Sequence, residues 1–206
     1  MIGTMEPTIT RGHLNPAALN SFDEKFRKAT FTLTNAAPMF AAMNGGAWAK
    51  YEERIRQYAK CPCGSARKGT LYLLTGTSTF GIKKAIDTEG IVQDAKDYPT
   101  FQTKQILTGK GGKTTNLQIP RAIWTAGCCV WKELEDVEEN RHVTRAESFA
   151  VMCNNEKDLD QVLLTEMSVK KLESLLKDSK KEEEVDLFPD IPICSSPENP
   201  DFELPL

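Results

Sequence analysis

Two short segments of this chain carry the residue types that a one-metal phosphodiesterase site requires. In Thr10-Arg11-Gly12-His13, the imidazole of His13 can take a proton from water, and the guanidinium of Arg11 can hold a phosphate oxygen. The second segment begins at Asn44, whose amide oxygen is a suitable ligand for a divalent cation. A base, a cation ligand and a phosphate-binding arginine together indicate metal-assisted hydrolysis.

The segment after Asn44 has helical periodicity, and we expect a helix over residues 45–59 with Asn44 as its N-cap. Its apolar stripe also contains Glu52 and is formed by Trp48, Tyr51, Ile55, Tyr58 and Ala59. The opposite, solvated face carries Lys50, Glu53, Arg54, Gln57 and Lys60. A carboxylate on the buried side needs a cation, a metal-bound water or an arginine as partner, which singles out Glu52.

Each candidate also has an ordinary structural interpretation. Glu52 can extend to solvent or pair with Arg56 at i+4, and Asn44 can be a helix cap alone. A lone histidine is more often structural, but the glycine before His13 and the nearby arginine favour catalysis. Eight helical residues span about 12 Å, so Asn44 and Glu52 should not both bind the ion directly. Glu52 is better suited to an outer position, or to orienting Arg11.

The net charge of −3 conceals an uneven distribution. Residues 1–126 hold 17 Lys and Arg against 9 Asp and Glu, whereas residues 127–206 hold 9 against 20. A surface for a polyanion should therefore come from the first part. Within the polar segment 81–116, Lys104, Lys110 and Lys113 are expected to meet phosphates without reading sequence. The stretch 109–115 lacks the glycine spacing of a phosphate-binding loop.

We expect an α+β fold, with a mostly antiparallel sheet, flanking helices and the Asn44 helix packed beside the strand of His13. Strands are expected at residues 29–35, 70–75, 119–131 and 148–153, and a Ser168-capped helix at 168–176. Loops or turns are expected at residues 22–28, 61–64, 75–78 and 132–147, and an inserted loop or irregular hairpin at 81–116. Residues 1–177 should form the domain, and the acidic, Pro-rich segment 178–206 a disordered tail.

The six cysteines permit disulfides without demanding them. Neither the Cys61/Cys63 nor the Cys128/Cys129 spacing is typical of zinc, and the two histidines lie far from both pairs. His142 follows a charged run and should be a surface residue. The chain has no apolar run long enough to span a membrane and no visible signal-peptide pattern.

Three stretches of the chain carry a family likeness. They are residues 11–16, residues 29–38 with Asn44 and 48–52, and the strand Leu71–Gly76 that ends in Thr-Gly; Ile119-Pro120 and Trp124 match more weakly. Over about residues 10–175 the chain resembles the DNA/RNA non-specific endonucleases of the ββα-metal (His-Me finger) class. Within that class it looks most like the branch of endonuclease domain-containing 1 proteins.

The resemblance implies a metal-dependent enzyme that hydrolyses DNA and RNA with little sequence preference, through contacts to the phosphate backbone. His13 would be the general base, Arg11 would hold a phosphate oxygen, and Asn44 would bind one Mg²⁺ (or Mn²⁺) ion. Asn35 matches a site residue that supports His13 or the scissile phosphate, and Glu52 completes the set. The family's secreted habit implies disulfides from the cysteine pairs to Cys153 or Cys194 and an extracellular location, with the cytoplasm as alternative.

Two departures from the family pattern favour a protein with reduced or no nuclease activity. The family usually has aspartate before Arg-Gly-His, where this chain has Thr10, so weaker metal binding and a slow enzyme are expected. The family domain usually carries several dozen residues ahead of this motif, so the chain resembles an N-terminally truncated domain. The alternative is a catalytically impaired relative that binds nucleic acid or a protein partner without cleavage. A third possibility is an interaction protein that acts through its acidic tail. The sequence does not indicate an oligomeric state.

Overall fold

The structure, a computed structural model, describes residues 9–82, 106–108, 114–136, 141–177, 184–195 and 204. The chain divides into two compact units. The first comprises residues 1–50, 76–123 and 153–164, and the second comprises residues 51–75, 124–152 and 165–206. The basic side chains expected at positions 104, 110 and 113 lie outside the described residues.

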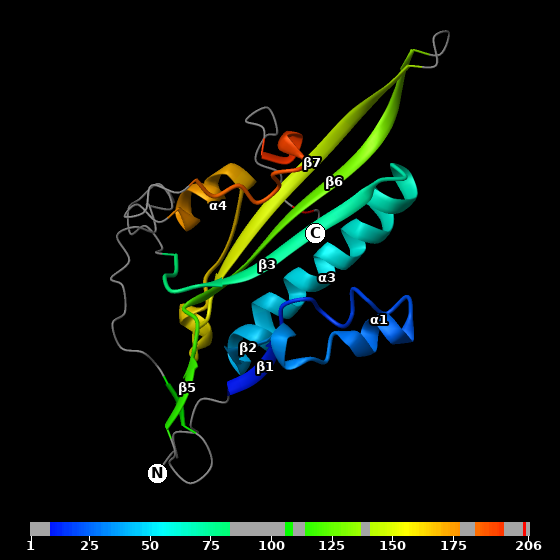
Figure 1. The fold of residues 1–206 in the computed structure, drawn as a ribbon. Coiled ribbons are helices and arrows are strands. Elements are labelled where there is room, and N and C mark those ends of the chain that lie inside the picture. The colour runs from blue at the N-terminus through cyan, green and yellow to red at the C-terminus, as the bar shows by residue number, and fades with distance from the viewer. Residues whose placement is uncertain are drawn as a thin grey trace. The chain divides into compact units, whose positions relative to one another are not determined.

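The described elements make an α+β protein, which confirms the fold class (Figure 1). The helices are α1 (Glu24–Ala29), α2 (Ala41–Met43), α3 (Ala49–Tyr58) and α4 (Val169–Leu176). The strands are β1 (Ile9–His13), β2 (Ala36–Phe40), β3 (Thr70–Ser78), β4 (Ile106–Thr108), β5 (Thr114–Gln118), β6 (Ala122–Asp136), β7 (Arg141–Asn154) and β8 (Leu164–Met167). Short 3₁₀ turns occupy Leu33–Asn35, Leu159–Gln161 and Pro192–Ser195, and π-helical turns occupy Asn44–Trp48 and Ala59–Ala66.

These strands form three sheets. A four-stranded sheet has the order β3-β6-β7-β8, with β6 and β7 as long neighbours (Figure 1). Strands β4 and β5 form an antiparallel pair, and so do β1 and β2. In the latter pair, Gly12 lies opposite Ala37 and must be small, because a Cβ there would be 2.0 Å from the sulfur of Met39.

The helix that follows β2 starts without an intervening loop, giving a strand–strand–helix unit. Asn155, which is 1% exposed, fixes this junction: its amide oxygen accepts from the Phe40 N–H at 2.9 Å. Its amide nitrogen donates to the carbonyls of Pro38 (3.0 Å) and Pro120 (2.9 Å). The next residue back, Asn154, bonds both the N–H and the carbonyl of Ile82. Buried amides thus hold β2 and its helix in place.

Several local predictions for the first part of the chain are wrong. The expected loop at 22–28 contains α1, whose cap is Asp23: its carboxylate accepts from the Lys25 and Phe26 backbone N–H groups. The β-rich stretch 29–35 is a turn that ends in a 3₁₀ turn, and the strand lies one step later, at β2. The alternation of Thr, Phe and Leu in this stretch does not reflect one buried face, since among those residues only Thr30 is buried.

In the second unit, the predicted apolar stripe of α3 is confirmed: Tyr51, Ile55 and Tyr58 are each at most 2% exposed. The solvated face is wrong at Arg54, which is paired with Glu166 and donates to the Leu204 carbonyl. The helical winding also continues through the segment 61–64, where the helix was expected to end.

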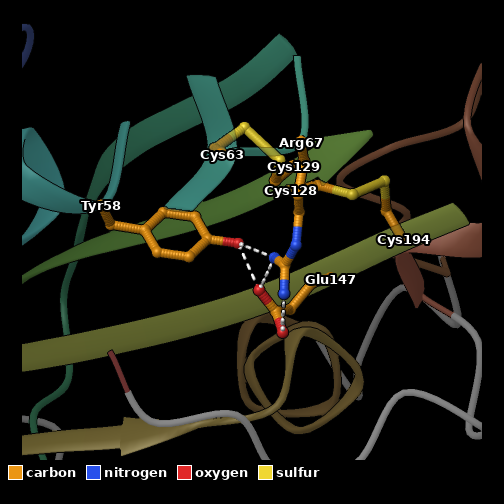
Figure 2. The surroundings of a disulfide bond; sticks show 7 residues. All are labelled: Tyr58, Cys63, Arg67, Cys128, Cys129, Glu147 and Cys194. Carbon is orange, nitrogen blue, oxygen red and sulfur yellow. Dashed lines mark hydrogen bonds and ion pairs between the residues drawn. A yellow bond between two sulfur atoms is a disulfide. The ribbon is translucent and has the colours of Figure 1, made fainter. Parts of the chain in front are cut away.

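Two disulfides meet at the adjacent cysteines of β6. Cys63 is joined to Cys129, and Cys128 to Cys194, which anchors the 3₁₀ turn at Pro192–Ser195 (Figure 2). Part of the predicted disordered tail, residues 184–195, is therefore folded. The expected partner Cys194 is confirmed, whereas Cys153 is a buried free thiol.

A polar cluster lies next to these bridges (Figure 2). The Tyr58 hydroxyl donates to the Glu147 carboxylate at 2.5 Å, and the Arg67 guanidinium pairs with the same carboxylate. Burial and the Glu147 carboxylate raise the pKa of Tyr58 above its ordinary value. Arg67 also lies 4.4 Å from the centre of the Trp131 ring. The cluster satisfies the polar ends of groups that the fold buries.

The remaining predictions are mixed. Strands at 70–75, 119–131 and 148–153 and the helix capped by Ser168 are confirmed, the cap accepting from the Lys171 N–H. The turn expected at 75–78 and most of the loop at 132–147 are strand instead. Among the described residues, no helix is long and apolar enough to cross a membrane.

Candidate active site

A cavity of about 360 Å³ in the first unit brings two of the predicted site residues together. Arg11 and His13 are alternate residues of β1, so their side chains leave the same face of the strand. Both line the cavity, and the other lining residues are Thr30, Phe31, Thr32, Leu33 and Ala36. The cavity therefore offers an imidazole and a guanidinium to one ligand, with no carboxylate among its lining groups.

The imidazole of His13 packs against an aromatic ring. The His13 and Phe31 ring centres are 4.9 Å apart with an interplanar angle of 87°. His13 is partly exposed and Arg11 is exposed, so solvent and ligands reach both. In the part of the chain that the structure describes, Arg11 has no ion-pair partner. Such a guanidinium is available for a phosphate.

Asn35 does not line the cavity, but its side chain connects the segment after His13 to the segment that contains Thr30. Its amide nitrogen donates to the carbonyls of Asn15 (2.9 Å) and Thr30 (2.8 Å), and its amide oxygen accepts from the Asn15 N–H (2.8 Å). The Leu14 N–H donates to the Asn35 carbonyl at 2.9 Å. The residues just after His13 are thus bound to the segment that carries the far wall.

Asn44 is not a helix N-cap, which corrects the sequence prediction. Its φ of −61° and ψ of −44° are helical, and the helix begins before it, at Ala41. The cap position belongs to Phe40, which Asn155 holds from a distant part of the sequence. Because Asn44 is not at the cap position, its side chain can bond elsewhere. Its amide nitrogen donates to the Thr10 hydroxyl at 3.0 Å.

Thr10 sets the orientation of that amide. The Thr10 hydroxyl donates to the Met39 carbonyl at 2.9 Å, so it has only acceptor capacity left for Asn44. An acceptor can pair only with the NH₂ end of the amide, which leaves the Asn44 oxygen on the other side. That oxygen has no hydrogen bond to any described residue, as a cation ligand requires. Asn44 does not line the cavity of Arg11 and His13 but is joined to the same strand.

The described residues contain no cluster of three or more His, Cys, Asp and Glu side chains that could hold a metal. In the described part of the first unit, the amide oxygen of Asn44 could hold a divalent ion together with water molecules. This donor set fits Mg²⁺, which prefers oxygen and keeps several of its waters.

Glu52 lies in α3 within the second unit, so the structure does not group it with Arg11, His13, Asn35 and Asn44. It is partly buried, at the start of the helix. The neighbouring Glu53 accepts two hydrogen bonds from Arg56, which lower the pKa of the Glu53 carboxyl to about 2. Arg56 thus pairs with Glu53, although the sequence offered it to Glu52.

Two residues that position the site were missed in the sequence. Asn155 appears only as half of an Asn-Asn pair after an apolar strand, and its contacts are with distant residues. Thr10 lacks the carboxylate of the aspartate that the family usually has there, but its hydroxyl accepts a hydrogen bond from the Asn44 amide. The Asn-Asn pair directly after an apolar strand is the sequence signal that could have indicated the role of Asn155.

Replacing Asn155 by alanine should lower the free energy of unfolding by about 2 kcal/mol, because it leaves buried backbone groups of residues 38, 40 and 120 unpaired. Urea denaturation would measure the loss. Asn20→Ala is the matched control, since its partners lie in a surface loop, and little change is expected. Equal stability of the two variants would contradict the anchoring role of Asn155.

The strand–strand–helix unit, with a histidine and an arginine on the first strand and an asparagine in the first helical turn, defines the class of ββα-metal nucleases. The family model of the DNA/RNA non-specific endonucleases matches residues 4–181. The chain belongs to this family of divalent-metal-dependent nucleases. None of the curated proteins compared with the chain matches it.

Proposed function

We propose that the chain is a metal-dependent endonuclease that hydrolyses DNA and RNA with little sequence preference, using His13 as general base and one Mg²⁺ (or Mn²⁺) ion at Asn44. The observation that carries this proposal is the shared cavity of Arg11 and His13, on a strand whose Thr10 also directs the Asn44 oxygen. Family membership supports the hydrolase class and the nucleic-acid substrate.

In the proposed reaction, neutral His13 takes a proton from the water that attacks phosphorus. Arg11 holds a non-bridging phosphate oxygen, so the phosphate is fixed beside the base. When bound, the divalent ion offsets the negative charge that develops on the phosphoryl oxygens and on the leaving oxygen. Contacts to the phosphate rather than to base edges give the enzyme little sequence preference.

Asn35 and Glu52 have supporting roles in this proposal. Asn35 holds the turn after His13 through the backbone of Asn15 and Thr30, so it positions the imidazole rather than touching the substrate. The role expected for Glu52 from the sequence, ordering a water of the ion or orienting Arg11, stays a prediction. The two disulfides support an extracellular location, because such bridges persist in oxidising compartments.

The deciding experiment is cleavage of supercoiled plasmid and of a structureless RNA, with Mg²⁺ and with EDTA. Cleavage of both only with the metal is expected. The alternative function, binding without cleavage, predicts intact plasmid and salt-sensitive DNA binding by folded protein. One of the features that favour this alternative is Thr10 in place of aspartate, and the Thr10 hydroxyl accepts a hydrogen bond from the Asn44 amide.

Removing the Thr10 hydroxyl should weaken metal binding about tenfold, because residues that orient a ligand typically contribute this much. In Thr10→Val the amide of Asn44 loses the acceptor that fixes its orientation. Mn²⁺ binding followed by electron paramagnetic resonance, without substrate, would measure the affinity. Thr10→Ser keeps the hydroxyl and should bind as the parent does. Equal binding by Thr10→Val and Thr10→Ser would show that the hydroxyl has no such role.

A further inference from the structure

An exposed aromatic ring stands at the cavity that holds Arg11 and His13. Phe31 is 60% exposed and Leu33 is 81% exposed, and both line this cavity. Large apolar side chains gathered beside a polar cavity typically mark a ligand surface. Neither side chain is part of the buried core, whereas Thr30 of the same turn is buried.

The ring has a free face close to the candidate base. Phe31 meets His13 edge to face, with centres 4.9 Å apart, so this contact leaves a broad face of Phe31 uncovered. A planar group stacked on that face would lie about 3.5 Å from the ring. It would then be within one nucleotide of a phosphate held beside His13 and Arg11.

The charges around the ring favour a nucleotide over an apolar partner. Arg11 and His13 share the cavity, and no carboxylate lines it. A lipid or a protein hydrophobic segment would have to cover this guanidinium, which costs free energy unless an anion accompanies it. A nucleotide provides the anion and the planar base in one ligand.

Resting on the proposed function, we propose that Phe31 stacks on a base next to the scissile phosphate, with Leu33 as its apolar rim, and that the site consequently prefers single-stranded over duplex nucleic acid. In a duplex both faces of each base are covered by neighbours, so stacking on Phe31 requires that the base leave its stack. In a single strand the base is free to turn. The ring contacts any of the bases alike, which agrees with little sequence preference.

The test compares parent, Phe31→Ala and Phe31→Trp on a single-stranded oligonucleotide and on its duplex. Stacking on an aromatic side chain predicts that the loss of kcat/KM in Phe31→Ala is about tenfold larger on the single strand than on the duplex. Phe31→Trp should retain the preference. Phe22→Ala is the matched control, because Phe22 is 76% exposed and does not line the cavity.

A second readout separates this inference from the proposed function. Binding of a fluorescent single-stranded oligonucleotide in EDTA should weaken about tenfold in Phe31→Ala, whether or not the chain cleaves. An oligonucleotide without bases should bind parent and variant alike. Equal losses on single strand and duplex would overturn the inference and show that Phe31 acts only by supporting His13. The same loss in Phe22→Ala would also overturn it.

Discussion

Replacing His13 by alanine should lower the rate of plasmid cleavage by about a thousandfold, the typical contribution of a positioned general base. The variant removes the only imidazole of the cavity, and the remaining lining groups include no carboxylate that could accept the proton. Arg11 remains, so substrate binding should change little and the loss should appear in kcat. Single-turnover cleavage with saturating Mg²⁺ would measure it.

His142→Ala is the matched control, because His142 is an exposed residue of β7 in the second unit. It should cleave as the parent does. Full activity in His13→Ala would show that another group is the base. A loss confined to KM would contradict the assignment too, since a residue needed only for binding affects substrate affinity and leaves kcat unchanged. Added imidazole should restore part of the lost rate.

Removing the bridge between Cys128 and Cys194 should lower the free energy of unfolding by about 4 kcal/mol, the chain-entropy value for a loop of this length. The bridge closes a sequence separation of 66 residues, as does the bridge between Cys63 and Cys129. The double variant Cys128→Ser with Cys194→Ser isolates the first bridge. Urea denaturation followed by tryptophan fluorescence would measure the loss.

Cys61→Ser is the control for the disulfide variants, because Cys61 is an exposed free thiol. Its stability should equal that of the parent. Alkylation of the native protein should modify Cys61 alone, since burial raises the pKa of the Cys153 thiol to about 12. Modification of four further cysteines without denaturant, or an unchanged midpoint in the double variant, would show that the bridges do not form.

Local sequence patterns were sufficient to predict strands and helices in which buried and exposed positions follow a regular period. The strands at 119–131 and 148–153 are apolar runs, and the buried stripe of α3 follows the helical period. Ser168 capped its helix because the bond to Lys171 is local. The candidate residues His13 and Arg11 were found from residue type and spacing, and their alternation on one strand places both in one cavity.

Contacts between distant residues decided the rest. The stretch 29–35 has β propensity, but Asn35 bonds the Asn15 and Thr30 backbones and folds it into a turn, which exposes Phe31. The helix begins before Asn44 because Asn155, 115 residues after Phe40, takes the Phe40 N–H. A hydrogen bond over such a separation leaves no local signal. The sequence therefore determined which groups could do the chemistry, and the tertiary structure decided which way the Asn44 amide faces and which ring lies beside His13.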